Sequence, residues 1–243
     1  MMLRRCAGAL AMATLAVLTA CSSGPKLEPG AGLQIISDLP SAAAIIAADV
    51  FSEQPVEATY EVVAGKDMGA VRMFRRGSTE QYGAAVVEEM VGQRTEFLRR
   101  DAHGNVLMTA VIDEGNNALT LFNPPIVVMP AELRRGERFE SRAAMRVVDA
   151  RNPTKERERG TAVRTVEYLG DRLLLTNFGK VATYQLKITF TADLRMADAE
   201  TNTTLYIAPE LGIVAEQSSE KVTVLGALTS EVGEVAVLIR EPK

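Results

Sequence analysis

Side chains able to act as nucleophiles, bases or metal ligands are sparse in this chain of 243 residues, which has one histidine and two cysteines. The histidine, His103, stands in the sequence DAHGN. A Ser-His-Asp triad needs its histidine beside an activated serine, and the sequence contains no G-x-S-x-G elbow. Zinc needs several Cys and His ligands at defined spacing. We therefore predict no catalytic histidine and no metal site, and interpret His103 as an exposed turn residue.

Adjacent acidic residues such as Glu88-Glu89 and Asp113-Glu114 are the remaining candidates for acid–base chemistry. Glycosidase-type catalysis needs two carboxyl groups that face each other across a cleft, whereas sequence neighbours on a strand point to opposite faces. The oxygen-rich sequences DEGNN and DAHGN lack the ligand spacing of an EF-hand and are typical of tight turns. We predict a non-enzymatic protein, with a carboxylate-dependent hydrolase as an alternative.

The stretch TTLYIAPELGIVAEQ, at 203–217, is a further candidate site. Pro209 fixes φ for a tight corner and Gly212 permits a positive φ before a strand resumes, so the pattern predicts a hairpin. A functional interpretation would place Tyr206 at the mouth of a ligand groove and Glu210 on its rim. We favour the structural interpretation and keep these two residues as weak candidates for ligand binding.

The first 20 residues have the composition of a secretory signal peptide. Arg4 and Arg5 precede an uncharged run from Cys6 to Ala20. That run is shorter than the roughly 20 residues of a membrane-spanning helix, and a basic start followed by a short apolar segment is typical of an export signal. Residues 1–20 are therefore excluded from the predicted fold.

The sequence Leu18-Thr19-Ala20-Cys21 resembles the lipobox of bacterial lipoproteins. In that family the cysteine thiol receives a diacylglyceryl group, and the cysteine becomes the acylated first residue of the mature chain. The resemblance implies that Cys21 is the lipidation site and that the protein is anchored to a membrane without spanning it. Because Ser22 follows and not Asp, the resemblance implies the periplasmic face of the outer membrane.

Charge and cysteine content limit the possible partners of the mature chain. The chain has 27 basic and 31 acidic residues, and loss of two arginines with the signal peptide leaves 25 − 31 = −6. An acidic domain is poorly suited to nucleic acid, so we predict no nucleic-acid partner. With Cys6 removed and Cys21 acylated, no thiol remains for a disulfide or a thiolate metal site. We predict no cofactor and a domain stabilised by its apolar core.

The chain after the signal peptide divides into a tether and a β domain. Residues 21–37 include SGPKLEPGAG, which is rich in Gly and Pro and predicts a lipid-anchored tether. The sequence DLPSAAAIIAADVF at 38–51 predicts a short helix, with Asp38 or Ser41 as its cap and Pro40 in its first turn. Residues 38–243 form the predicted β domain, and one or two subdomains remain possible.

Alternating apolar and polar residues separated by turn sequences predict antiparallel hairpins from residue 56 onward. FNPPIVVMP at 122–130 contains three prolines, so we predict that it forms no central strand and either crosses an edge or joins two parts of the sheet. The charged sequence RNPTKERERG at 151–160 predicts a solvated hairpin tip. About a dozen strands and one short N-terminal helix predict a mainly β fold with a large curved antiparallel sheet, either a half-barrel or a sandwich.

The pattern aromatic-x-Ala-Pro-x-x-Gly-x-Val, from Tyr206 to Val214, is similar to a turn in periplasmic antiparallel-sheet proteins of bacteria. Those proteins have been compared in fold with the half-barrels that carry lipoproteins across the periplasm. The resemblance implies a similar order of strands and no particular activity.

Three functions remain open for a lipid-anchored envelope protein of this kind. A structural or protein-interaction module at the periplasmic membrane surface predicts an exposed apolar or edge-strand patch over a filled interior. A carrier or sensor of a lipid-like apolar ligand predicts an aliphatic cavity closed by the helix at 38–51. A hydrolase requires two converging acids with perturbed pKa values. The expected partners are the membrane, through Cys21, and an envelope protein or an apolar ligand.

Overall fold

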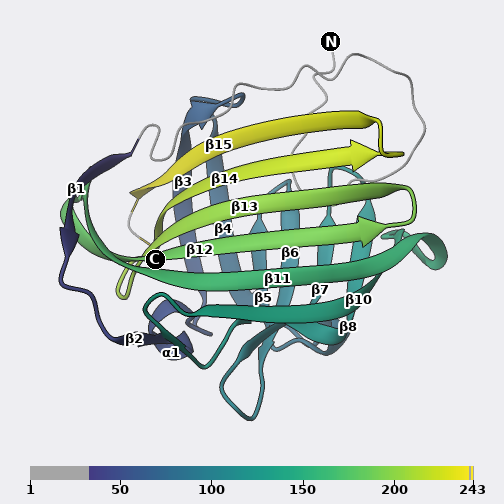
Figure 1. Ribbon diagram of the computed structural model, residues 1–243, viewed down its shortest axis with the longest axis horizontal. Helices are drawn as coiled ribbons and strands as arrows, with labels where there is room; N and C mark the ends of the chain where they lie inside the picture. The colour runs from purple at the N-terminus through teal and green to yellow at the C-terminus, as the bar shows by residue number, and fades with distance from the viewer. Residues whose placement is uncertain (1–32, 241, 243) are drawn as a thin grey trace.

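The computed structural model describes residues 33–240 and 242, and most of them lie in one large antiparallel sheet (Figure 1). Twelve of its strands follow one another as a meander, and the last of these, β15, pairs with the first, β3. The sheet therefore closes into a ring. The twelve strands are β3 (Val56–Gly65), β4 (Val71–Ser78), β5 (Val86–Met90), β6 (Arg94–Arg100), β7 (Val106–Asp113), β8 (Ala118–Met129), β10 (Arg138–Asp149), β11 (Asn152–Thr176), β12 (Gly179–Leu194), β13 (Ala197–Ala208), β14 (Gly212–Val224) and β15 (Leu228–Arg240).

The ring is flattened into two walls. Figure 1 shows β11–β15 in front and β3–β7 behind, with the strands of the two walls crossing at a steep angle. Side chains alternate between the two faces of each strand, and the inward apolar side chains of both walls pack together. Leu98, Val147, Val166 and Ile188 belong to this main core. The predicted mainly β fold with a large curved antiparallel sheet is confirmed, and its closure replaces the open half-barrel or sandwich.

One end of the ring is covered by a small second sheet, formed by β2 (Ala44–Ile46) and β9 (Glu132–Arg134). Ile45 of β2 pairs with Leu133 of β9, and the two side chains are 1% and 0% exposed. The short helix α1 (Ala47–Val50) follows, and Ala47 is also buried in the main core. We call this end the closed end.

The predicted helix over 38–51 is wrong except for the single turn of α1. The strand β1 (Gln34–Leu39) covers the start of that range and also the last residues of the predicted tether, 21–37. The alanines favour a helix, but Ile45 gains more by burial in a strand pair, where β-branched side chains pack well. Tertiary packing therefore overrides the local preference. The earlier part of the tether lies outside the described residues.

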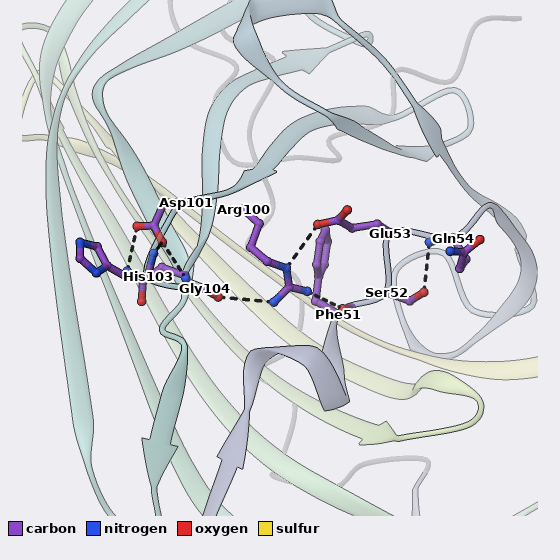
Figure 2. A network of polar contacts seen from close by, with 9 residues as sticks. Phe51, Ser52, Glu53, Gln54, Arg100, Asp101, His103 and Gly104 are labelled. Carbon is purple, nitrogen blue, oxygen red and sulfur yellow. Dashed lines mark hydrogen bonds and ion pairs between the residues drawn. The ribbon is translucent and has the colours of Figure 1, made fainter.

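Arg100 holds the segment after α1 against the turn between β6 and β7 (Figure 2). Its guanidinium donates hydrogen bonds to the carbonyl oxygens of Phe51, at 3.1 Å, and Gly104, at 3.4 Å, and its Nε lies 3.2 Å from Glu53 Oε1. Two guanidinium groups approach the ring of Phe51, that of Arg100 at 5.7 Å and that of Arg76 at 5.2 Å from its centroid. Phe51 thus helps to seal the closed end.

The prediction that the prolines of 122–130 keep this segment out of a central strand is wrong. Pro124 and Pro125 lie within β8, which has β7 on one side and β10 on the other. The ladder to β7 is interrupted between Leu121 and Ile126, and the pairing with β10 ends at Asn123. The prolines fall in this interruption, where a strand loses little by lacking their N–H groups.

The hairpin predicted from Tyr206 to Val214 is confirmed. β13 ends at Ala208 and β14 begins at Gly212, which has the expected positive φ of 71°. The charged segment 151–160 lies at the hairpin between β10 and β11 and is exposed over 151–156, as predicted, but β11 already starts at Asn152 and pairs with β10. Only the two residues before it form the turn. The charged residues of β11 can remain in a strand because their backbone groups form hydrogen bonds with β10 almost up to the turn.

The seam between β3 and β15 closes the ring, and Gly65 lies opposite Glu234 in it. Gly65 has a φ of +108°, and a Cβ atom there would lie 2.4 Å from the carbonyl oxygen of Gly233. Arg72 of β4 forms a two-pronged ion pair with Glu234, and Asp67 approaches the same guanidinium at 3.5 Å. The seam therefore combines a backbone ladder with an ion pair that links β15 to β4 past β3.

Replacing Gly65 with alanine is predicted to lower the free energy of unfolding by about 3 kcal/mol, because strained backbone conformations cost about 1–3 kcal/mol each and the new methyl group meets the facing strand. Urea unfolding followed by circular dichroism measures the change. Gly77→Ala is the matched control, since Gly77 also lies in a strand and has open space around its Cα. Equal effects of the two substitutions would contradict the proposed role of the seam.

Candidate functional site

The inward face of the ring is charged over a large area away from the closed end. On the rear wall, one inward row runs from Arg76 through Glu88 and Glu96 to the buried Val111. On the front wall, Arg164 lies between Ala162 and Val166, both in the main core. We call these charged side chains the luminal charge cluster. Its members are Arg72, Arg76, Glu88, Arg94, Glu96, Asp113, Arg164, Glu216, Glu220 and Glu234.

Solvent reaches the luminal charge cluster from the end opposite the closed end. Arg76 and Glu88, nearest the closed end, are 14% and 16% exposed, whereas Glu96 is 20% and Arg94 50% exposed. Arg94 adjoins the turn between β5 and β6 and faces inward with Glu96. Arg94 is thus the most exposed of these four side chains, and we call the end at this turn the open end.

Three of the four arginines in the cluster are paired with carboxylates. The pairs are Arg72–Glu234, Arg76–Glu88 with a nitrogen–oxygen distance of 2.6 Å, and Arg94–Glu96 at 2.5 Å. A charge removed from water is tolerated when a partner of opposite charge and hydrogen bonds replace its hydration. These pairs therefore satisfy most of the positive charge inside the ring.

Arg164 differs from the other three arginines. Its Nε atom is buried and has no hydrogen-bond partner within the described part of the chain. Burial lowers the pKa of its guanidinium to about 10; the negative charges of Glu96 and Glu216 act against this shift, and the positive charge of Arg94 adds to it. Arg164 is thus a half-buried cation that forms no ion pair among the described residues, although the charges of Glu96 and Glu216 act on it.

Glu216 and Glu220 lie on the inner face of β14, and burial raises the pKa of both carboxyl groups. For Glu220 the pKa rises to about 7, with Asp113 adding to the rise and Arg94 opposing it. Four residues along a strand separate two Cα atoms by about 13 Å. The two carboxyl groups therefore do not face each other across a cleft, as a glycosidase requires.

Tyr206 and Glu210, the candidates from the sequence, lie apart from the luminal charge cluster. Tyr206 is 2% exposed and belongs to a small apolar cluster with Leu174 and Val214, on the outer face of β13. Its hydroxyl accepts a hydrogen bond from Gln185 Nε2 at 3.2 Å, and burial raises the pKa of the phenol. Glu210 is exposed in the adjoining turn. The structure brings these residues to one hairpin.

His103 is exposed in the turn between β6 and β7, as the sequence predicted. Its backbone N–H donates a hydrogen bond of 2.8 Å to Asp101 Oδ1 (Figure 2). No group of three or more His, Cys, Asp or Glu side chains within residues 33–240 is arranged to hold a metal ion. Cys21, the predicted lipidation site, lies outside the described residues.

Two hollows on the described structure lie on the outer face of the front wall. One is a groove of about 310 Å³ lined by threonines and by Asp193, Asp198, Glu200 and Lys221. A smaller one, of about 60 Å³, includes Lys187. Most residues that line the two hollows are polar or charged, so the hollows differ from the aliphatic cavity that a carrier of apolar ligands requires.

The luminal charge cluster was not predicted from the sequence. A signal was present in β14, where the six residues EQSSEK at 216–221 are all polar. A strand with one face in an apolar core alternates apolar and polar residues, so an unbroken polar run indicates that both faces meet polar surroundings. Glu88 and Asp113 were considered as catalytic acids, but their place on the inner face depends on closure of the ring.

The fold and site define a closed antiparallel meander barrel with one apolar closed end and one charged open end.

No family model matches the chain, and no curated protein matches it. Two chains among the solved structures match. One is the hypothetical lipoprotein YmcC from Escherichia coli (K12), with 12% identity over 79% of this chain and 90% of that chain. The TM-score of 0.35 is too low to indicate that the two chains share a fold. Among the described helices, none is long and apolar enough to cross a membrane.

Replacing Glu220 with glutamine is predicted to stabilise the protein at pH 8 and to have no effect below pH 4.5. The carboxyl pKa is about 7 in the folded chain and 4.5 without the protein environment, so ionisation disfavours the folded state. The wild-type protein therefore loses stability as the pH rises from about 4.5 through 7. The gain is at most about 3 kcal/mol, at about 1.4 kcal/mol per pKa unit, and smaller where solvent screens the charge.

Urea unfolding at several pH values measures this difference. Glu210→Gln is the control, because Glu210 is an exposed glutamate on the neighbouring turn and should leave the pH profile unchanged. If Glu220→Gln and the wild type show parallel pH profiles, the buried environment assigned to Glu220 is wrong.

Proposed function

We propose that this protein is a non-enzymatic, lipid-anchored protein of the bacterial cell envelope that acts as a structural or protein-interaction module at the periplasmic surface of the outer membrane. The observation that carries the interaction role is the exposed edge strand β1. It pairs antiparallel with Leu175–Asp171 of β11 and lies at the end of the strand order among the described residues. Its other edge therefore presents backbone N–H and C=O groups that another strand can use.

Exposed apolar side chains accompany this edge. Ile35 and Ile36 of β1 are 42% and 44% exposed, and Leu175 of the neighbouring β11 is 44% exposed. A peptide that adds a strand to a sheet gains affinity from backbone hydrogen bonds and specificity from side-chain contacts. The edge of β1 offers both. We therefore assign it to a protein partner that adds an extended segment to the sheet.

The position of β1 in the chain agrees with a partner at the same membrane. β1 begins at Gln34, 34 − 21 = 13 residues after Cys21. Thirteen residues span at most about 45 Å when fully extended. A lipid on Cys21 would keep the edge of β1 within this distance of the membrane surface, where other envelope proteins are concentrated.

The two alternative functions have less support. The apolar part of the interior is filled by side chains such as Leu98, Ile126 and Val166, which are 0–2% exposed, so a lipid-like ligand would have to displace them. A carboxylate-dependent hydrolase agrees with the raised pKa values of Glu216 and Glu220 but needs two acids that face each other. The interaction module requires neither change.

Replacing Cys21 with serine is predicted to move the protein from the membrane fraction to the soluble periplasmic fraction, because the serine hydroxyl cannot carry the thioether-linked lipid. Cell fractionation followed by immunoblotting measures the distribution. Cys6→Ser is the matched control, since Cys6 lies within the predicted signal peptide and should leave the mature protein anchored. Retention of the Cys21→Ser protein in the membrane fraction would refute the anchor.

A photocrosslinking amino acid at Ile36 is predicted to form a covalent adduct with an envelope protein in living cells, since this side chain lies beside the free edge of β1. The same amino acid at Lys221 is the control, because Lys221 is exposed on the outer face of β14. Denaturing electrophoresis and mass spectrometry identify the adducts. The interaction role would be rejected if Ile36 gave no protein adduct or the same adducts as Lys221.

A further inference from the structure

Arg164 is expected to lower the stability of the folded protein, because its guanidinium has no ion-pair partner among the described residues. Within the described structure, the other three arginines of the luminal charge cluster each form an ion pair, whereas the Nε of Arg164 is buried without a hydrogen-bond partner. A half-buried charge without an ion-pair partner is unfavourable, and an apolar side chain of similar size can be more favourable there. A guanidinium with a buried, unpartnered Nε is suited to a partner from outside the chain.

A second polar group without a partner faces the interior near Arg164. In the front wall, Arg164 of β11 lies opposite Phe190 of β12, which in turn lies opposite Thr201 of β13. The hydroxyl oxygen of Thr201 is buried and makes no hydrogen bond to the described residues. Two strand spacings separate the two residues by about 10 Å. A small polar ligand over Phe190 would reach both groups.

The luminal charge cluster has four arginines and six acids, so an anion is favoured at this place only when some of these acids are protonated, below neutral pH. Arg94 of the rear wall is close enough to lower the pKa of Arg164, and its side chain is 50% exposed at the open end. Glu96 also acts on Arg164, and because Glu96 pairs with Arg94 at 2.5 Å, the two charges of this pair largely offset each other. Burial raises the pKa of Glu216, so protonation weakens its repulsion of an anion as the pH falls.

Glu220 completes the set of acids that face this position. It lies opposite Thr201 in the same cross-strand row, and its pKa of about 7 leaves it largely protonated at pH 6. A protonated carboxyl group is a hydrogen-bond donor as well as an acceptor. Below neutral pH, the row therefore offers donors from Arg164, Thr201 and Glu220 to one ligand.

We propose that the luminal charge cluster is a binding site for a small soluble ligand with an oxyanion group, a carboxylate or a phosphate, held by the guanidinium of Arg164 with Arg94 and Thr201 beside it. Guanidinium groups bind such oxyanions through parallel charge-assisted hydrogen bonds. The ligand enters through the open end, where Arg94 is exposed. This site is on the inner face of the ring and is separate from the edge of β1 assigned to a protein partner.

The test compares Arg164→Met with Arg76→Met in the full-length protein, purified in detergent. Arg76 pairs with Glu88 and lies over the rings of Phe51 and Phe74, so Arg76→Met should lower the melting temperature. Arg164→Met should leave the melting temperature unchanged or raise it, because the substitution removes a half-buried charge that has no ion-pair partner among the described residues. A loss as large as that of Arg76→Met would show that Arg164 has a structural role and would overturn the proposal.

Titration calorimetry at pH 6 and constant ionic strength then measures binding of inorganic phosphate and of acetate. The wild type should bind at least one of the two oxyanions, and which one it binds identifies the preferred group. Arg164→Met should weaken that binding at least tenfold. Nonspecific effects of phosphate on the protein should be the same in both variants and therefore do not produce this difference. Absence of binding by the wild type, or equal binding by Arg164→Met, would overturn the proposal. Neither result depends on the lipid anchor or on β1.

Discussion

The pairing of β3 with β15 is the constraint on which the rest of this structure depends. It joins Gly65 to Glu234, which are 234 − 65 = 169 residues apart, and the entropy of closing so long a loop must be overcome before the contact is gained. Every other neighbouring pair in the ring is joined by a local hairpin or, between β8 and β10, by a short connection. Without the seam, the same strands would form an open sheet whose inner face meets water. With it, that face becomes an interior.

Closure also explains how one interior holds both an apolar core and charged side chains. The small sheet of β2 and β9, together with α1 and Phe51, adds apolar side chains at the closed end, and their burial supplies much of the stability. Toward the open end the arginines are mostly paired and partly hydrated. Arg164 is the exception in the described structure, and a residue that lowers stability is often retained for binding.

The strands and turns were largely predictable because they follow local rules. Alternation of apolar and polar residues indicates strands, and Gly212 and the residues around His103 indicate turns. The predictions that failed share a cause. The helix at 38–51 was displaced by burial of Ile45 against Leu133, and Pro124 was accommodated by a bulge between two partners. Both outcomes depend on contacts between segments far apart in the chain.

The sequence by itself determined the mainly β class, the hairpins and the acidic net charge, because backbone preferences and side-chain alternation act over a few residues. Only the tertiary structure decided that the sheet closes and which of the two faces of each strand becomes the interior. Where both faces of a strand are polar, as in β14, alternation does not distinguish inside from outside. Glu216, Glu220 and Arg164 come together because closure brings the front wall over the rear wall, a long-range event that no local pattern records.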